Sequence, residues 1–228
     1  MSIGRSMHLL QFGDSLLPVG SFSFSNALEA AVQEGVVRDA TTLTEFVRTA
    51  TRRAATSDGI ALVHSCRAAR AGELDQITRA DHAVLDRKLG EEMRTMTVRM
   101  GRKLAEVAET TCQAPLLRRW LGRVRDGLTP GTYPVGLGVL MAELGSPEED
   151  AFAIHQYGVA MTTLGAALRL MRLDHHQAQA ILYAVNADVD GDYASIRDAG
   201  LADMSSFAPM ADILGAIHVK ARVRMFMS

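Results

Sequence analysis

Apolar residues recur every three to four positions along almost the whole chain, and this spacing constrains the fold more than any other feature. Between residues 91 and 109, a helix would place one stripe on a single face, formed by Met93, Met96, Met100, Leu104 and Val107. Alternating polar and apolar residues, which are typical of strands, are almost absent before residue 218. The sequence therefore predicts an all-α fold, a compact bundle of about eight to ten helices.

Residues that favour helix starts mark most of the expected boundaries. Ser146, Pro147 and Glu149 provide an N-cap hydroxyl, a first-turn proline and an acidic N3 residue, and this helix should run to about Arg172. The acidic run 188–192 is typical of a turn. We also expect capping boxes at Asn26 with Glu29 and at Thr42 with Glu45, further helix starts at Asp58, Pro115 and Asp174, and a short last helix around 209–217.

The clearest loop is the segment 127–132, GLTPGT, which separates a charge-rich front from an apolar, small-residue back half. It is short for a linker, so we expect a single all-α domain over 1–228 with a seam at 127–132. Gly136 and Gly138, in the helix expected after this loop, would allow another backbone to approach closely.

Composition restricts the classes of partner and the compartment. A formal net charge of −2 gives no general attraction to nucleic acid or membranes. The best candidate for a membrane-spanning segment, 157–168, is uncharged but shorter than the roughly 20 residues that a spanning helix needs. Cys66 and Cys112 are far apart and form no CxxC pair. This spacing argues against a disulfide framework and is consistent with a reducing compartment. We expect a cytoplasmic protein.

Candidate metal or catalytic groups are few. Asp174, His175 and His176 are adjacent, but neighbouring residues on a helix point about 100° apart, and Asp174 is better placed as a helix cap. The run 188–192 lacks the glutamate that a calcium loop needs at its twelfth position. The methionine stripe is typical of a core face. We expect no catalytic residue, metal or cofactor, and a small helical metalloenzyme that uses Asp174, His175 and His176 remains the alternative.

Residues 16–29, LLPVGSFSFSNALE, form a proline–glycine turn that leads into a helix. Pro18 and Gly20 suit two positions of the turn, and the serines that follow could accept the unpaired N–H groups of the helix start. Glu29 would then lie in the first helical turn. The segment is a well-formed helix start and also a distinctive pattern.

The last eleven residues, HVKARVRMFMS, are the only part that alternates between polar and apolar residues. They contain three cations and no acidic residue, which indicates an extended tail at 218–228 with one apolar side. A terminal segment is usually frayed unless something binds it. The apolar side predicts a groove on this molecule or on a partner, and a disordered end is the alternative.

Three stretches resemble signatures of the urease accessory F family. The first is PVGSFSFSNALE, and the second is the closing pattern of residues 205–210, His218 and 224–228. The third, YPVGLG at 133–138, is similar to the opening of the family's central small-residue helix. Val219 departs from the family, which usually carries a glutamate after the histidine. The matches occur in the right order over nearly the whole chain.

The resemblance implies a non-enzymatic, all-α, usually dimeric protein that helps to load nickel into apo-urease. Such proteins bridge the urease accessory D/H scaffold protein to the nickel-delivery GTPase and couple GTP hydrolysis to nickel transfer. Glu29 resembles the family's candidate GTPase contact, Arg169 stands where many members have lysine, and the tail resembles the part that meets the scaffold. The implied partner-binding residues are Pro18, Gly20, Ser21, Phe22, Ser23, Ser25, Glu29, Arg169, His218, Arg222, Arg224, Phe226 and Ser228. A GTPase-activating protein that acts alone through an arginine is a second alternative.

Overall fold

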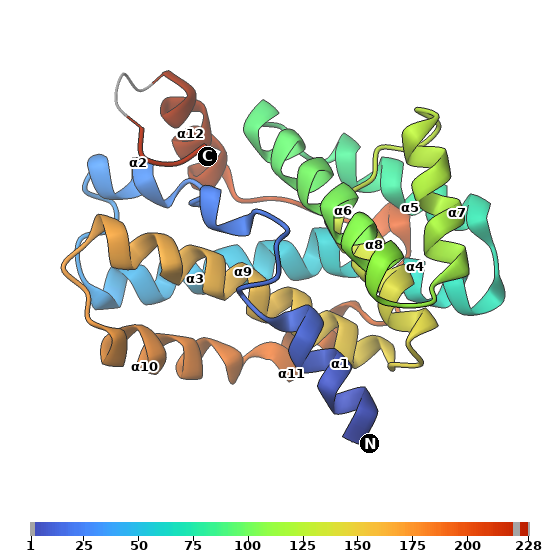
Figure 1. Ribbon diagram of the computed structural model, residues 1–228. Helices are drawn as coiled ribbons and strands as arrows, with labels where there is room; N and C mark the ends of the chain where they lie inside the picture. The colour runs from blue at the N-terminus through green and yellow to red at the C-terminus, as the bar shows by residue number, and fades with distance from the viewer. Residues whose placement is uncertain (1–2, 221–223, 228) are drawn as a thin grey trace.

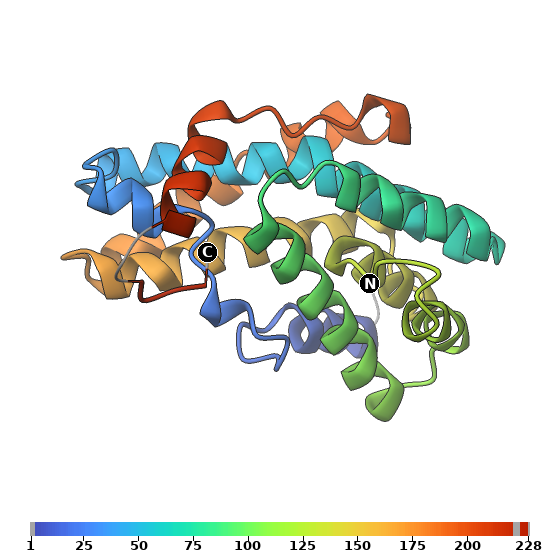
Figure 2. The same cartoon turned by 90° about the horizontal axis from the view of Figure 1, so that it is seen from above.

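The computed structural model describes residues 3–220 and 224–227, and a long helical rod runs through its centre (Figures 1 and 2). The rod consists of α3 (Ala40–Ala54), a π-helical segment (Ala55–Gly59) and α4 (Ile60–Ala71) without a break. Asp58 therefore lies inside the rod, and the expected helix start at this position is wrong. Its carboxylate binds the ammonium group of Lys88 instead of capping a helix.

Other helices surround this rod, and no strand occurs within 3–220 or 224–227. The all-α prediction is confirmed. The remaining elements are α1 (Ile3–Gly13), a 3-10 turn η1 (Ser21–Ser23), α2 (Leu28–Gln33), α5 (Leu74–Asp86), α6 (Glu91–Thr111), α7 (Pro115–Arg125), α8 (Tyr133–Glu143), α9 (Glu148–Leu170), α10 (His175–Asn186), α11 (Val189–Ile196), a 3-10 turn η3 (Leu201–Asp203) and α12 (Pro209–Lys220).

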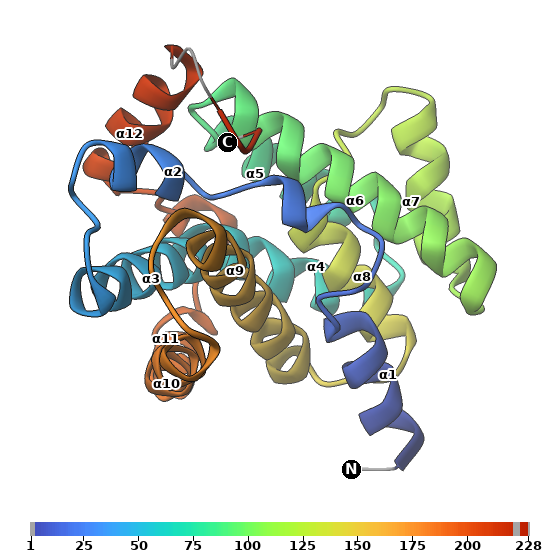
Figure 3. The ribbon, with the colours of Figure 1, turned by 60° about the vertical axis from the view of Figure 1, so that its left-hand side comes forward.

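The buried apolar side chains form two clusters. One contains Trp120 and Phe152 and lies among α4, α5, α6, α7, α8 and the first half of α9. The other contains Leu28, Leu43 and Phe226 and lies among α2, α3, α10, α12 and the second half of α9. Figure 3 shows α9 passing along both groups of helices. Because α3–α4 and α9 contribute to both clusters, the two halves share their longest helices.

The loop 127–132 is anchored to the first cluster by one buried carboxylate. Asp81 on α5 accepts hydrogen bonds from Thr129 Oγ1, Gly131 N and Thr132 N at 2.7–2.8 Å, and from the indole N–H of Trp120 at 3.2 Å. The backbone of the loop also passes so close to Gly101 on α6 that a β-carbon there would meet Gly131 and Thr132. The seam predicted at this segment stays a prediction.

Several helix starts differ from the expectation because another residue satisfies the first N–H groups. Asp39 caps α3 and forms the capping box with Thr42, one turn before the expected Thr42–Glu45 pair. Asn26 and Ala27 both adopt positive φ angles, 54° and 66°, so the expected Asn26–Glu29 capping box is wrong. The hydroxyl of Ser25 accepts the Glu29 N–H instead, at 3.4 Å.

Three further helix starts were predicted from capping residues or a first-turn proline. Asp174 caps α10 and pairs with Gln177, and α7 begins at Pro115, both as predicted. Ser146 does not cap α9, which begins at Glu148 after Pro147 in an extended conformation. The acidic run 188–192, expected as a turn, is mostly helical and begins α11.

Candidate partner-binding site

Residues 224–227, here called the tail segment, dock onto the N-terminal part of this same molecule. The carboxylate of Glu29 accepts the backbone N–H groups of Met225 at 2.7 Å and of Phe226 at 3.0 Å. The backbone N–H of Met227 donates to the carbonyl of Ser23 at 2.9 Å. Figures 1 and 3 show the C-terminus beside α2 and the start of α6. The sequence left open a groove on this molecule or on a partner, and in the structure the tail segment binds to this molecule.

The helical part of the tail is longer than expected. α12 continues to Lys220, so the prediction of an extended segment from His218 onward is wrong for 218–220. Intrahelical bonding at these positions outweighs the alternating pattern. Residues 221–223 and 228, which include the predicted site residues Arg222 and Ser228, lie outside the described residues.

Glu29 lies in the first turn of α2, as expected, and it is buried, with 3% of its surface exposed. The first turn of α2 faces α12 and the tail segment, so its carboxylate binds inward. Burial raises the pKa of this carboxyl, but hydrogen bonds from the Met225 N–H, His218 and the Phe226 N–H outweigh that effect and lower the pKa below its usual value. The charged form is the one that holds the tail segment.

His218 and Glu92 complete the polar part of this site. The ring nitrogens of His218 lie 3.0 Å from Oε2 of Glu29 and 3.0 Å from Oε2 of Glu92 on α6. The other oxygen of Glu92 accepts from Arg224 of the tail segment at 2.7 Å. Three helices and the tail segment thus meet at two carboxylates, one imidazole and one guanidinium group.

Arg169 on α9 joins the two ends of the chain. Its guanidinium lies 4.1 Å from the centre of the Phe226 ring, and it donates to the carbonyl of Phe22 at 2.8 Å. Phe226 itself is buried in the second cluster. We call Phe22, Ser23, Glu29, Glu92, Arg169, His218 and the tail segment the tail site.

Comparison with known proteins shows the family of this chain. The UreF family model matches residues 37–186. The chain belongs to the UreF family. It is 54% identical over 227 residues to proteins named urease accessory protein UreF 2 from Brucella canis and Brucella abortus, covering 100% of this chain and 93% of each relative. It is 49% identical over 228 residues to the urease accessory protein UreF of Yersinia enterocolitica, covering 99% of both chains.

The tail site brings together most of the residues that the UreF resemblance assigns to partners. Pro18 and Gly20 lie beside it, where they line a groove with Met227, and Gly20 has a left-handed φ of 85°. Ser21 starts η1, and Ser25 is fully buried beneath Glu29. Glu92 was not predicted. An acidic residue in the first turn of α6 is ordinary in sequence, and only the fold places it opposite His218.

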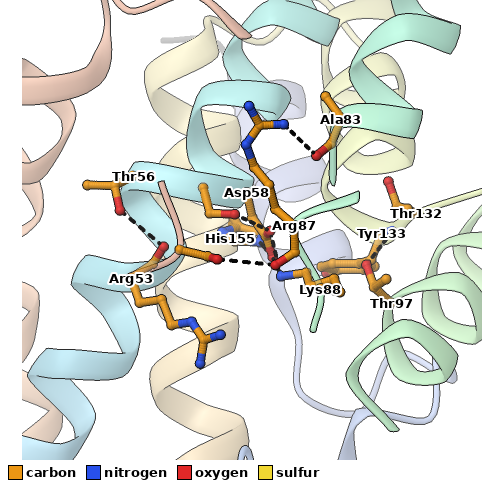
Figure 4. Close-up of polar contacts among 12 residues, drawn as sticks. Arg53, Thr56, Asp58, Ala83, Arg87, Lys88, Thr97, Thr132, Tyr133 and His155 are labelled. Carbon is orange, nitrogen blue, oxygen red and sulfur yellow. Dashed lines mark hydrogen bonds and ion pairs between the residues drawn. The ribbon is translucent and has the colours of Figure 1, made fainter. Parts of the chain in front are cut away.

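A second polar group is buried at the centre of this UreF-family chain (Figure 4). Lys88 Nζ lies 2.6 Å from Oδ1 and 2.8 Å from Oδ2 of Asp58, and His155 Nε2 lies 4.0 Å from the same Oδ2. Tyr133 stacks on the His155 ring at 6.2 Å between centroids. Burial lowers the pKa of His155 to about 4, so the imidazole is neutral near pH 7. No motif in the sequence predicts that these four residues lie together.

Asp58, Tyr133 and His155 of this group line a cavity of about 350 Å³, which is also lined by the N-terminal loop. Met96 and Met100 line this cavity, whereas the fully buried face of α6 consists of Thr97, Gly101, Leu104, Ala105 and Ala108. The three methionines of the predicted stripe are therefore half-buried beside the core face, and only Leu104 of that stripe is fully buried. Its smaller neighbours pack closer to α8.

The alternative metal group does not converge. Asp174 accepts the Gln177 N–H at 2.8 Å as a helix cap, and His175 and His176 lie exposed in the first turn of α10. Over residues 3–220 and 224–227, no three His, Cys, Asp or Glu side chains are grouped to hold a metal ion. Within the same residues, no helix is both long and apolar enough to cross a membrane.

Proposed function

We propose that this chain is a non-catalytic assembly factor for urease, which links the accessory D/H scaffold protein to the nickel-delivery GTPase on apo-urease in the cytoplasm. Family membership supports a role in urease maturation. The observation that carries the finer proposal is the tail site, where the two terminal motifs form one fixed surface. A homodimer is part of the proposal and rests on the family resemblance.

The exposed residues around the tail site suggest which faces meet partners. Four large apolar side chains on and before α12 are 39–86% exposed, namely Phe207, Met210, Ile213 and Ile217. The last three share one face of the helix, at spacings of three and four residues. Met225 of the tail segment is 62% exposed. An apolar stripe of this size is typical of a protein interface, and we assign it to the scaffold protein. Phe22 in the N-terminal motif is 70% exposed, and we assign it to the GTPase.

Surface substitutions test the assignment without removing buried contacts. The double variant Met210→Asp, Ile213→Asp should weaken binding to the scaffold protein by at least about tenfold, because each side chain would bury apolar area worth about 1.5–3 kcal/mol. Co-elution by size-exclusion chromatography measures the loss, and circular dichroism checks the fold. Phe22→Asp tests the GTPase assignment in the same way.

Leu128→Asp is the matched control, because Leu128 is equally exposed, at 60%, and lies in the loop 127–132 on the other cluster. It should bind the scaffold protein as the wild type does. Normal co-elution of the α12 double variant would show that this stripe is not the docking surface.

A further inference from the structure

His218 is the buried link between α12 and two other helices, and both of its ring nitrogens face carboxylates. Nδ1 lies 3.0 Å from Glu92 Oε2 and Nε2 lies 3.0 Å from Glu29 Oε2, with the side chain fully buried. An ionised carboxylate can only accept hydrogen bonds. Two such bonds therefore require a proton on each ring nitrogen, so the imidazole is held as the imidazolium cation.

The carboxylates themselves are held in the ionised form. Glu29 also accepts two backbone N–H groups of the tail segment, and Glu92 also accepts from the guanidinium of Arg224 at 2.7 Å. A protonated carboxyl would lose acceptor capacity toward these donors. The shared proton of each His218–Glu pair is thus placed on His218.

We propose that the proton on His218 controls the docking of the tail segment, which is closed when the imidazole is charged and released when it is neutral. In the closed state, two positive groups, His218 and Arg224, balance the charges of Glu29 and Glu92. Loss of the proton leaves one ring lone pair facing a carboxylate oxygen and one buried negative charge without a partner. Both are costly away from water.

Among the side chains that the structure describes, the other charged groups near the site do not replace this proton. Arg169 is placed over the Phe226 ring and the Phe22 carbonyl, and Glu91 adds a further negative charge beside Glu92 in the same groove. At the far end of α12, Asp212 is paired with Arg53 on α3. The contacts that weaken first on deprotonation are therefore those that join α12 and the tail segment to α6.

Hydrogen exchange of the isolated chain tests the proposal. The amides of Met225, Phe226 and Met227 are all hydrogen-bonded in the closed state, so their protection measures docking. After correction for intrinsic rates, we expect protection to fall by up to about tenfold per pH unit once His218 loses its proton, because one proton is linked to closure. Nitrogen-15 spectra of the imidazole report its protonation in the same samples.

Three variants separate this effect from a structural one. His218→Gln should show weak protection at every pH, with no transition. Glu92→Gln keeps an acceptor but removes one of the two charges that stabilise the imidazolium, so the transition should move to lower pH. His176→Gln, an exposed position on α10, should behave as the wild type. Protection that stays constant while His218 deprotonates, or an unchanged transition in Glu92→Gln, would overturn the proposal.

The effect on partners rests on the proposed function and has its own readout. Binding of the scaffold protein, measured on both sides of the transition, should weaken together with the protection of the tail segment. If the tail segment is released and binding of the scaffold protein does not change, the control by the proton on His218 still holds. That result would contradict the role of the tail site in binding the scaffold protein. The two failures are therefore distinguishable.

Discussion

At the scale of single residues, His155 makes folding depend on pH in a predictable direction. Burial is the main cause that lowers its pKa to about 4, from an unfolded value of about 6.5. Below about pH 6.5 the unfolded chain gains a proton that the folded chain does not, so stability falls as the pH decreases toward 4. When the pH is lowered from about 7 to about 5, His155 should reduce the free energy of unfolding by about 2 kcal/mol.

Urea unfolding at these two pH values checks this prediction. His155→Gln should lose about 2 kcal/mol less than the wild type over the same interval, whereas His176→Gln, exposed on α10, should keep the wild-type difference. Equal losses in the wild type and in His155→Gln would show that His155 is protonated in the folded chain.

The functional residues were only partly predictable at this scale. The terminal motifs contain Glu29, His218 and Phe226, but no pattern in them predicts that these residues lie together in the tail site. Contacts across 189–197 positions of sequence depend on tertiary packing, which local periodicity does not encode. Glu92 and His155 gave no sequence signal, because their roles arise only from what surrounds them in the fold.

At the scale of elements, the closest helix contacts depend on glycine. A β-carbon at Gly138 on α8 would meet the Ser65 hydroxyl and lie 2.6 Å from the carbonyl oxygen of Leu62 on α4. Because the obstacle includes backbone, α4 and α8 would have to separate. Gly138→Ala should therefore destabilise the protein by about 1–3 kcal/mol despite the higher helix propensity of alanine.

Gly122→Ala on α7 is the matched control, because a β-carbon there would have no neighbour within 4 Å. It should stabilise the protein by about 0.5–1 kcal/mol through helix propensity alone. Urea denaturation measures both changes, and a Gly138→Ala variant as stable as the wild type would contradict the close contact.

Element positions followed from sequence where local chemistry determines them. The Asp174–Gln177 capping box and Pro115 set helix starts within a few residues, and the spacing in Gly136 and Gly138 indicated a close approach. The prediction failed at Asp58, where a buried ion pair with Lys88 stabilises a polar residue inside a helix. Local patterns do not distinguish a capping aspartate from one whose partner lies on another element.

At the scale of the whole molecule, the tail segment contributes a side chain to the second cluster and none to the first. Phe226 packs with Leu28 and Leu43, whereas Trp120, the single tryptophan, belongs to the first cluster. Removing residues 224–228 would expose the Phe226 site and leave the buried Glu29 carboxylate without two of its donors. We therefore expect the loss of stability to be confined to the helices of the second cluster, and to affect α2 and α12 first.

This division predicts two different responses in the truncated chain. Hydrogen exchange of α2 and α12 should accelerate by at least about tenfold, since burial of a phenylalanine contributes about 1.5–3 kcal/mol. The fluorescence emission of Trp120 should remain that of a buried indole, because Asp81 and the loop 127–132 still enclose it. A red-shifted emission in the truncated chain would instead mean that the shared helices α9 and α3–α4 transmit the loss, and that the two clusters unfold as one unit.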